Sequence, residues 1–328
     1  MLRLIVIEGL FFYSNQLDRA ISDFDKAIEI NPKIAMVYYN RGLVFRNKGQ
    51  YDQAIADYDR AIEINPEFTI AYSNRGLIFA GRGQYDQAIS NFDKAIEINP
   101  KFVMAYSNLG LVFNIMGRYD QAISDYDKAI KINPKLAIVY FNWGLALSKK
   151  GEYDQTIINY NKAIEINPKY AEAYFNRGII FSKKGQYDQA ISNYDQAIKI
   201  NPKYSNAYLN RGLAFYNKGQ YDQAIFNFDQ AIEINQKFAE AYYNKGFALY
   251  NKGQHDQAIS NYDKAIKINP KLAEAYYNRA VLYFHKKEYH KAWTDVSKAQ
   301  TLGYKIYPKF LEALQKAFGK WEPYKILI

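Results

Sequence analysis

Apolar residues recur along this chain with the 3.6-residue spacing of amphipathic helices, and the pattern repeats every 34 residues. In residues 35–68, Tyr38, Gly42 and Phe45 lie at positions i, i+4 and i+7, which predicts a first helix. A second apolar stripe follows, made of Ala54, Ile55, Tyr58, Ala61 and Ile62. Each 34-residue repeat is therefore predicted to form a hairpin of two helices.

Glycine and proline mark the ends of these predicted helices. Gly49 follows the first stripe, and glycine readily adopts the left-handed conformation that ends a helix. Pro66 follows the second stripe and cannot continue a helix. An Asn-Pro pair recurs at the same place, with proline at Pro32, Pro66, Pro100, Pro134, Pro168, Pro202 and Pro270. Gln236 replaces the proline once, without changing the spacing.

Small residues form two further columns. Glycine occupies the centre of the first helix at Gly42, Gly76, Gly110, Gly144, Gly178, Gly212 and Gly246, and the column ends in Ala280. Glycine inside a helix costs about 0.5–1 kcal/mol relative to alanine, so its recurrence predicts a close approach of the partner helix. The facing column is Ala54, Ala88, Ala122, Ala190, Ala224, Ala258 and Ala292, with Thr156 as the exception.

These columns resemble the tetratricopeptide repeat, whose signature is W-x2-L-G-x2-Y, then A-x3-F, then P, with a period of 34. The residues that carry the resemblance in residues 35–68 are Tyr38, Gly42, Phe45, Ala54, Tyr58 and Pro66. The resemblance implies an all-α, right-handed superhelical solenoid of antiparallel helix hairpins. It also implies a concave groove, lined by the first helices, that binds peptide segments or partner proteins.

We expect eight full repeats, at residues 35–68, 69–102, 103–136, 137–170, 171–204, 205–238, 239–272 and 273–306. Residues 1–34 would form a degenerate N-terminal repeat, which leaves open whether the chain is part of a longer protein. Residues 307–319 are predicted to form a capping helix, followed by a tail at 320–328. The cap would pack the side chains of Phe310, Leu311, Leu314 and Phe318 onto the last hairpin.

Asparagine occupies one position of every first helix. The column is Asn40, Asn74, Asn108, Asn142, Asn176, Asn210, Asn244 and Asn278. Asparagine is a poor residue inside a helix because its amide competes for the backbone. An amide carries both donors and an acceptor, so a ladder of amides can hold the backbone of an extended peptide. Superhelical members of the resembled family carry a similar ladder. The alternatives are that each asparagine bonds the neighbouring repeat, or that duplication simply copied it.

Two columns flank the asparagines on the same helix face. One is apolar: Leu43, Leu77, Leu111, Leu145, Ile179, Leu213, Phe247 and Val281. The other changes from Met36, Ile70, Met104 and Ile138 to Glu172, Asn206, Glu240 and Glu274. Nearby positions change from Ser73, Ala80, Ser107 and Ser148 to Phe175, Tyr216, Tyr243, Tyr250, Tyr277 and Phe284. The predicted groove is thus apolar early and aromatic and acidic late, unless the aromatic residues serve packing between repeats.

The predicted peptide-binding residues combine these columns. They are the eight asparagines together with Leu145, Phe175, Ile179, Leu213, Tyr216, Tyr243, Tyr250 and Tyr277. The special case of the family that clamps a terminal carboxylate needs Lys or Arg in the inner columns. Those columns hold other residue types, so we expect no such clamp.

A basic column precedes the glycines, where the family signature has leucine. It consists of Arg41, Arg75, Arg177, Arg211, Lys245 and Arg279, with Leu109 and Trp143 as exceptions. We expect these cations to pair with an aspartate column in the second helix of the same repeat: Asp59, Asp93, Asp195, Asp229 and Asp263. Where Trp143 replaces arginine, Asn161 replaces aspartate, but Leu109 keeps Asp127.

Composition argues against an enzyme and against a metal site. The chain has no cysteine and only three histidines, His255, His285 and His290, which lack metal-ligand spacing. We find no set of nucleophile and base and no glycine-rich phosphate loop, and we expect no cofactor. We expect a cytoplasmic protein, since no run of apolar residues is long enough to cross a membrane.

Three functions stay open at this stage. The first is a scaffold or adaptor that binds an extended peptide or a partner protein in the groove. The second is RNA binding, suggested by the net charge of +10 and 17% aromatic residues. The third is self-assembly through the apolar ends, at residues 2–12 and 321–328, which is compatible with the first.

Overall fold

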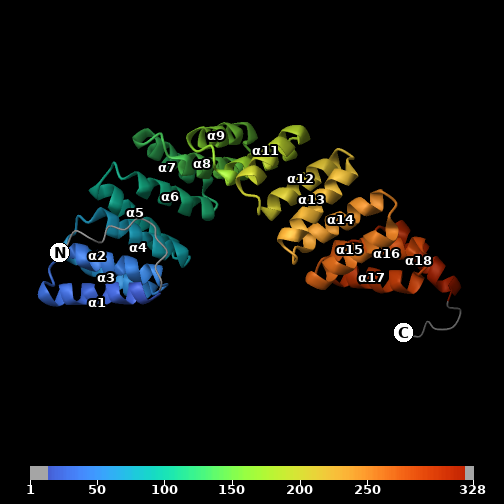
Figure 1. Cartoon of the computed structure of the whole chain (residues 1–328), viewed down its shortest axis with the longest axis horizontal. Coiled ribbons are helices and arrows are strands. Elements are labelled where there is room, and N and C mark those ends of the chain that lie inside the picture. Colours follow the sequence, from blue (N-terminus) through green and yellow to red (C-terminus); the bar gives the residue numbers. More distant parts are fainter. Residues whose placement is uncertain (1–13, 322–328) are drawn as a thin grey trace. The chain divides into compact units, whose positions relative to one another are not determined.

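A computed structural model describes residues 14–321 of the chain, and residues 1–13 and 322–328 lie outside the description (Figure 1). Contacts divide the chain into two compact units, which we call the N-terminal half, up to Ile166, and the C-terminal half, from Asn167 onward. The described residues form helices and no strands. The predicted all-α fold of stacked helix hairpins is confirmed.

Nine helices form the described part of the N-terminal half. They are α1 (Ser14–Ile30), α2 (Ala35–Asn47), α3 (Tyr51–Ile64), α4 (Thr69–Gly81), α5 (Tyr85–Ile98), α6 (Val103–Ile115), α7 (Tyr119–Ile132), α8 (Ala137–Lys150) and α9 (Tyr153–Ile166). The even-numbered helices are the first helices of the repeats, and each pairs with the odd-numbered helix that follows it.

The described part of the C-terminal half continues this alternation. Its helices are α10 (Ala171–Lys183), α11 (Tyr187–Ile200), α12 (Ser205–Asn217), α13 (Tyr221–Ile234), α14 (Ala239–Asn251), α15 (His255–Ile268), α16 (Ala273–His285), α17 (Tyr289–Thr301) and α18 (Pro308–Trp321). Within each half, the first helices of consecutive hairpins also contact one another, as α4 does α6 and α12 does α14. The first helices of each half therefore form a continuous wall, which we call the inner wall.

The turn inside a hairpin depends on one residue with a positive φ. Gly49 has φ +74°, and the backbone N–H of Gln50 then donates to the carbonyl oxygen of Phe45 at 2.9 Å. Lys287 takes the same role in the last hairpin with φ +59°, a conformation that L-residues other than glycine adopt less readily.

The turn between hairpins depends on asparagine rather than on proline. The side-chain oxygen of Asn65 accepts a hydrogen bond from the backbone N–H of Glu67 at 3.1 Å. Asn235 accepts the same bond from Lys237 at 3.1 Å, although Gln236 stands where other repeats have proline. This local bond explains why the spacing survives the substitution.

The glycine column lies against an aromatic ring of the second helix. A Cβ atom added to Gly178 would lie 2.6 Å from Cε1 of Tyr194, a fully buried ring. The corresponding ring is tyrosine or phenylalanine in each repeat that has this glycine: Tyr58, Phe92, Tyr126, Tyr160, Tyr194, Phe228 and Tyr262. The ring, more than the alanine column, thus explains the absence of a side chain at these glycines.

Helix α18 packs onto the last hairpin. Leu314 is fully buried, and the ring of Phe310 contacts Phe284 with the centroids 5.4 Å apart. The ring of Phe318 stacks on Trp293 at 5.6 Å. The apolar ends that we considered for self-assembly lie outside the residues whose side chains the structure describes.

We predict that Gly178→Ala destabilises the chain by about 1–3 kcal/mol, because the added methyl group must displace the Tyr194 ring. Gly81→Ala is the matched control, since a Cβ there has no atom within 4 Å. The control should be neutral or slightly stabilising because alanine is the better helix former. Urea unfolding followed by circular dichroism measures both, and equal stability of the two variants would contradict the close contact.

The buried tyrosine hydroxyls give a second test. The hydroxyl of Tyr126 has no hydrogen-bond partner among the described residues, whereas that of Tyr194 bonds Ser182 at 3.1 Å. Burial raises the pKa of Tyr194 to about 12, and the Ser182 bond opposes this shift. We predict that Tyr126→Phe is neutral or stabilising, while Tyr194→Phe loses about 1 kcal/mol. Thermal unfolding that ranks the variants the other way would refute this assignment.

Candidate functional site

The asparagine column lies on the inner wall of each half. Its members are half-buried, apart from Asn142, which is buried. Three residues further along each helix lies the apolar column, in which Leu145, Ile179 and Leu213 are also half-buried. Amides and apolar side chains thus share one helix face, as their i, i+3 spacing requires.

Two asparagines of the column are tied to the preceding repeat. Asn74 Nδ2 donates to the hydroxyl of Tyr39 at 3.1 Å, and Arg46 donates to Asn74 Oδ1 at 2.6 Å. Asn278 Nδ2 donates to the hydroxyl of Tyr243 at 3.1 Å. In both cases a tyrosine stands 35 residues before the asparagine. For these two residues, the alternative of a bond to the neighbouring repeat holds.

Other asparagines bond only their own helix. The amide nitrogens of Asn210 and Asn244 donate to the carbonyl oxygens of Asn206 and Glu240, at 2.8 and 2.7 Å. Asn176 makes the same bond to Glu172, at 2.8 Å. This bond uses one N–H of each amide and leaves its Oδ1 and second N–H available.

The sequence explains why these amides are not tied across repeats. The residues 35 positions before Asn210 and Asn244 are Phe175 and Leu209, which have no hydroxyl group. In the N-terminal half, the side-chain amides of Asn108 and Asn142 form no hydrogen bond with the residues that the structure describes. The column therefore contains two kinds of amide: those bonded to a tyrosine of the preceding repeat, which we call tied, and those without a bond to another repeat, which we call available.

Some of the predicted groove aromatics serve packing. The ring of Phe175 lies 4.8 Å from that of Tyr204. The ring of Tyr277 lies 4.9 Å from Tyr304 and 5.7 Å from Phe310. These contacts join each first helix to the turn or helix that follows its hairpin, so packing accounts for both residues.

Four rings of α12 and α14 form a cluster beside Asn244, which we call the aromatic patch. Phe247 lies at its centre and stacks on Tyr216 with the centroids 5.4 Å apart. Tyr243 and Tyr250 are stacked with Phe247 at 6.3 and 6.4 Å. All four rings are half-buried, so part of each ring is available for contact.

The column one turn before the asparagines is exposed in both halves. In the N-terminal half its members are apolar, and Met36 is 52% and Met104 46% exposed. In the C-terminal half its members are Glu172, Asn206, Glu240 and Glu274, all exposed. The two halves thus present the same amide column beside opposite surface chemistry.

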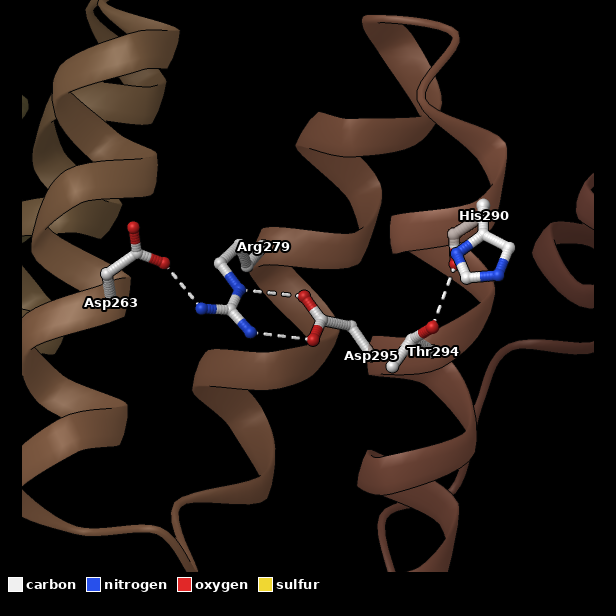
Figure 2. Close-up of polar contacts among 5 residues, drawn as sticks. All are labelled: Asp263, Arg279, His290, Thr294 and Asp295. Atoms are coloured by element: carbon white, nitrogen blue, oxygen red, sulfur yellow. Dashed lines mark hydrogen bonds and ion pairs between the residues drawn. The ribbon is translucent and has the colours of Figure 1, made fainter.

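The basic column pairs with the predicted aspartate column of the preceding repeat, which corrects our expectation that the two columns pair within one repeat. Figure 2 shows Arg279 on α16 between Asp263 on α15, in the preceding repeat, and Asp295 on α17. The guanidinium donates two hydrogen bonds to Asp295, each of 2.7 Å. The same bridge recurs as Arg41 with Asp25 and Asp57, Arg75 with Asp59 and Asn91, and Arg211 with Asp195 and Asn227.

Burial governs the electrostatics of this bridge. It raises the pKa of Asp295, whose side chain is only 6% exposed, and the hydrogen bonds from Arg279 oppose the shift. Burial acts against the charge of Arg279, but the hydrogen bonds and negative charges of Asp295 and Asp263 together outweigh burial and raise the pKa of the guanidinium. The arginine therefore stays charged, and the carboxylate depends on it as a partner.

A lysine replaces the missing arginine next to Leu109. Lys128 Nζ donates to Asp125 at 2.9 Å and lies 5.7 Å from the ring of Tyr106. Burial raises the pKa of Asp125, and Lys128 opposes this shift. Where Trp143 replaces the arginine, its buried indole Nε1 has no hydrogen-bond partner among the described residues.

A second set of cross-repeat ion pairs was not predicted from the sequence. A basic residue at or just after the end of a first helix pairs with the aspartate in the first turn of the preceding second helix. Examples are Arg82 with Asp52 at 2.7 Å and Lys150 with Asp120 at 2.8 Å. The fixed separation of 30 residues was the available signal.

The described residues contain no group of three or more metal-ligating side chains positioned to hold a metal ion. Among the helices of residues 14–321, none is both long and apolar enough to cross a membrane.

The cross-repeat bridge predicts unequal effects of two substitutions. Arg279→Ala leaves Asp295 buried without its partner and should destabilise the C-terminal half by about 3–5 kcal/mol. Lys245→Ala is the control, because Lys245 binds the 45% exposed Asp229 and should cost under about 1 kcal/mol. Hydrogen exchange of α16 and α17 measures the loss, and similar effects of the two changes would exclude the bridge as a stabilising contact.

Comparisons with known proteins agree with this fold. A family model described as tetratricopeptide repeat matches residues 35–68, 69–102 and 103–136. A model described as TPR repeat matches residues 10–48, 144–185, 180–219, 212–253 and 248–287. A comparison with curated proteins found no match.

Solved structures are similar in fold. A tetratricopeptide repeat protein from Parabacteroides merdae is 21% identical with a TM-score of 0.57, over 76% of this chain and 98% of that one. The pilF protein of Pseudomonas aeruginosa is 22% identical with a TM-score of 0.55, over 62% and 92% of the two chains. YrrB is described as a TPR protein with an unusual peptide-binding site. It is 25% identical with a TM-score of 0.48, over 57% of this chain and 97% of that one.

Repeats of this kind generally serve as scaffolds for interactions between proteins. The matches to the family models cover more than half of the sequence, and helix hairpins form each described repeat. On these grounds, the chain belongs to the tetratricopeptide repeat family.

Proposed function

We propose that this chain is a non-catalytic scaffold that binds an extended segment of a partner protein along the inner wall of its first helices. The observation that carries the proposal is the state of Asn210 and Asn244. Each amide keeps an acceptor oxygen and one N–H that no described residue uses. The apolar column lies beside them and can contact the side chains of the segment.

The spacing of the wall suits an extended backbone. Packed helices lie about 8–10 Å apart, and an extended chain rises about 3.3 Å per residue. One amide of the wall therefore meets about every third residue of the segment. A side-chain amide can both donate to a peptide carbonyl and accept from a peptide N–H, so it holds the backbone whatever its sequence.

A protein segment fits the wall better than RNA does. The three inner columns contain Asn, apolar residues and Glu but no Lys or Arg. Binding of a phosphate backbone depends on Lys and Arg that release its counterions. The complete absence of cysteine suits a reducing compartment, so the proposal places the scaffold in the cytoplasm.

The test begins with a phage-displayed library of unstructured peptides, selected on the immobilised full chain. The selected peptides are then titrated against Asn210→Ala/Asn244→Ala, which removes two available amides. We expect affinity to fall by about 30-fold, since the variant removes at least two hydrogen bonds and each contributes about 1 kcal/mol. Circular dichroism should remain helical, because alanine is a better helix former than asparagine.

Asn74→Ala/Asn278→Ala is the matched control. It makes the same chemical change at two amides that are already tied to tyrosine hydroxyls. We expect this control to change affinity much less than the first variant does. Equal losses from the two variants, no loss from either, or a library that yields no binder would each contradict the proposal.

A further inference from the structure

We infer that the inner wall of the C-terminal half selects an extended segment rich in lysine and arginine, an inference that rests on the proposed function. It follows from two features of the wall beside the asparagine column. One is a row of exposed glutamates without ion-pair partners, and the other is the aromatic patch of α12 and α14.

The glutamates share a helix face with the asparagine column. Glu172, Glu240 and Glu274 stand in the first turns of α10, α14 and α16, four residues before an asparagine of the column. The two residues are directly linked in α14, where the backbone oxygen of Glu240 accepts a hydrogen bond from the side-chain amide of Asn244. A segment bound to the amides therefore passes within reach of these carboxylates.

These carboxylates differ from the aspartates between repeats. In the C-terminal half, Asp195, Asp229 and Asp263 each pair with Arg or Lys of the next repeat, and so do Asp188, Asp222 and Asp256. The three glutamates form no ion pair with any residue that the structure describes. Their negative charge is thus available to a ligand.

Helix stability alone does not require glutamate at this position. A carboxylate in the first turn does favour the helix dipole. However, the N-terminal half has Met36, Ile70, Met104 and Ile138 at the same position of helices of similar length, and α12 has Asn206. The position therefore accepts other residues without loss of the helix, so the glutamates can serve in binding.

The aromatic patch adds a second attraction for cations. Faces of aromatic rings attract ammonium and guanidinium groups. This chain already uses the contact internally, since the guanidinium of Arg211 lies 5.3 Å from the ring centroid of Tyr208. Phe247 and Tyr243 lie one turn or less from Asn244, so the amide, the patch and Glu240 act on the same stretch of a bound segment.

The net charge of the chain distinguishes this inference from general electrostatic attraction. With a net charge of +10, the chain as a whole repels cations and attracts anions. A preference for a basic peptide can therefore arise only from a local surface of opposite sign. General electrostatic attraction would produce the reverse preference.

The experiment uses three peptides of about 12 residues, each labelled with an uncharged dye. They alternate alanine with lysine, with glutamine or with glutamate, so that side chains of one type share a face when the peptide is extended. Fluorescence anisotropy measures their binding to the full chain. We expect the lysine peptide to bind most tightly. We expect Glu172→Gln/Glu240→Gln/Glu274→Gln to weaken it about tenfold, the sum of three exposed ion pairs, and to leave the glutamine peptide unchanged.

The control Glu97→Gln/Glu165→Gln/Glu233→Gln changes the charge equally at exposed positions of the second helices α5, α9 and α13. It should leave the order of the peptides unaltered. The inference is overturned if the glutamate peptide binds as tightly as the lysine peptide, if the control acts like the test variant, or if no peptide binds.

The proposed function is tested separately with Asn210→Ala/Asn244→Ala and the glutamine peptide. Binding of that peptide that depends on the two amides, without a preference for lysine, would overturn this inference and support the proposed function. Binding that is indifferent to the amides would contradict both.

Discussion

The structure depends on the close contact between the central glycine of the first helices from α2 to α14 and a buried ring of the second helix. At Gly178 there is no space for a methyl group between the backbone and Tyr194. The contact fixes the rotation of the first helix about its axis, and so it decides which side chains face the partner helix. Because the asparagine precedes the glycine by two positions, it is turned away from the ring and onto the inner wall.

Charges are distributed unequally between the two sides of this framework. Between repeats, cations and carboxylates bridge one hairpin to the next, as Arg279 does for Asp263 and Asp295. On the inner wall of the C-terminal half, the exposed glutamates form no such pairs with the described residues. Paired charges stabilise the stack. The unpaired glutamates lie beside asparagine amides and half-buried rings, and aromatic rings are typical of binding hot spots. The same repeat thus serves both needs with different faces.

The sequence predicts the fold well because every helix start, turn and buried stripe recurs with one period. It predicts the asparagine column but not its division, because that depends on a residue 35 positions earlier in a neighbouring helix. Tyr39 and Tyr243 tie their asparagines, whereas Phe175 and Leu209 cannot. The pairing of Asp59 was assigned to the wrong arginine for a related reason. Periodicity aligns equivalent positions, but it does not reveal whether a column faces its own repeat or the next one.

The central claim is that available amides, rather than the inner wall in general, hold the ligand. It is tested most directly by the side-chain amide resonances of the asparagines in ¹⁵N-labelled protein, recorded during titration with a selected peptide. The account predicts that the resonances of Asn210 and Asn244 shift and saturate with the binding curve while that of Asn278 stays in place. Shifts confined to Asn278, or no shift of any asparagine side chain at saturation, would contradict it.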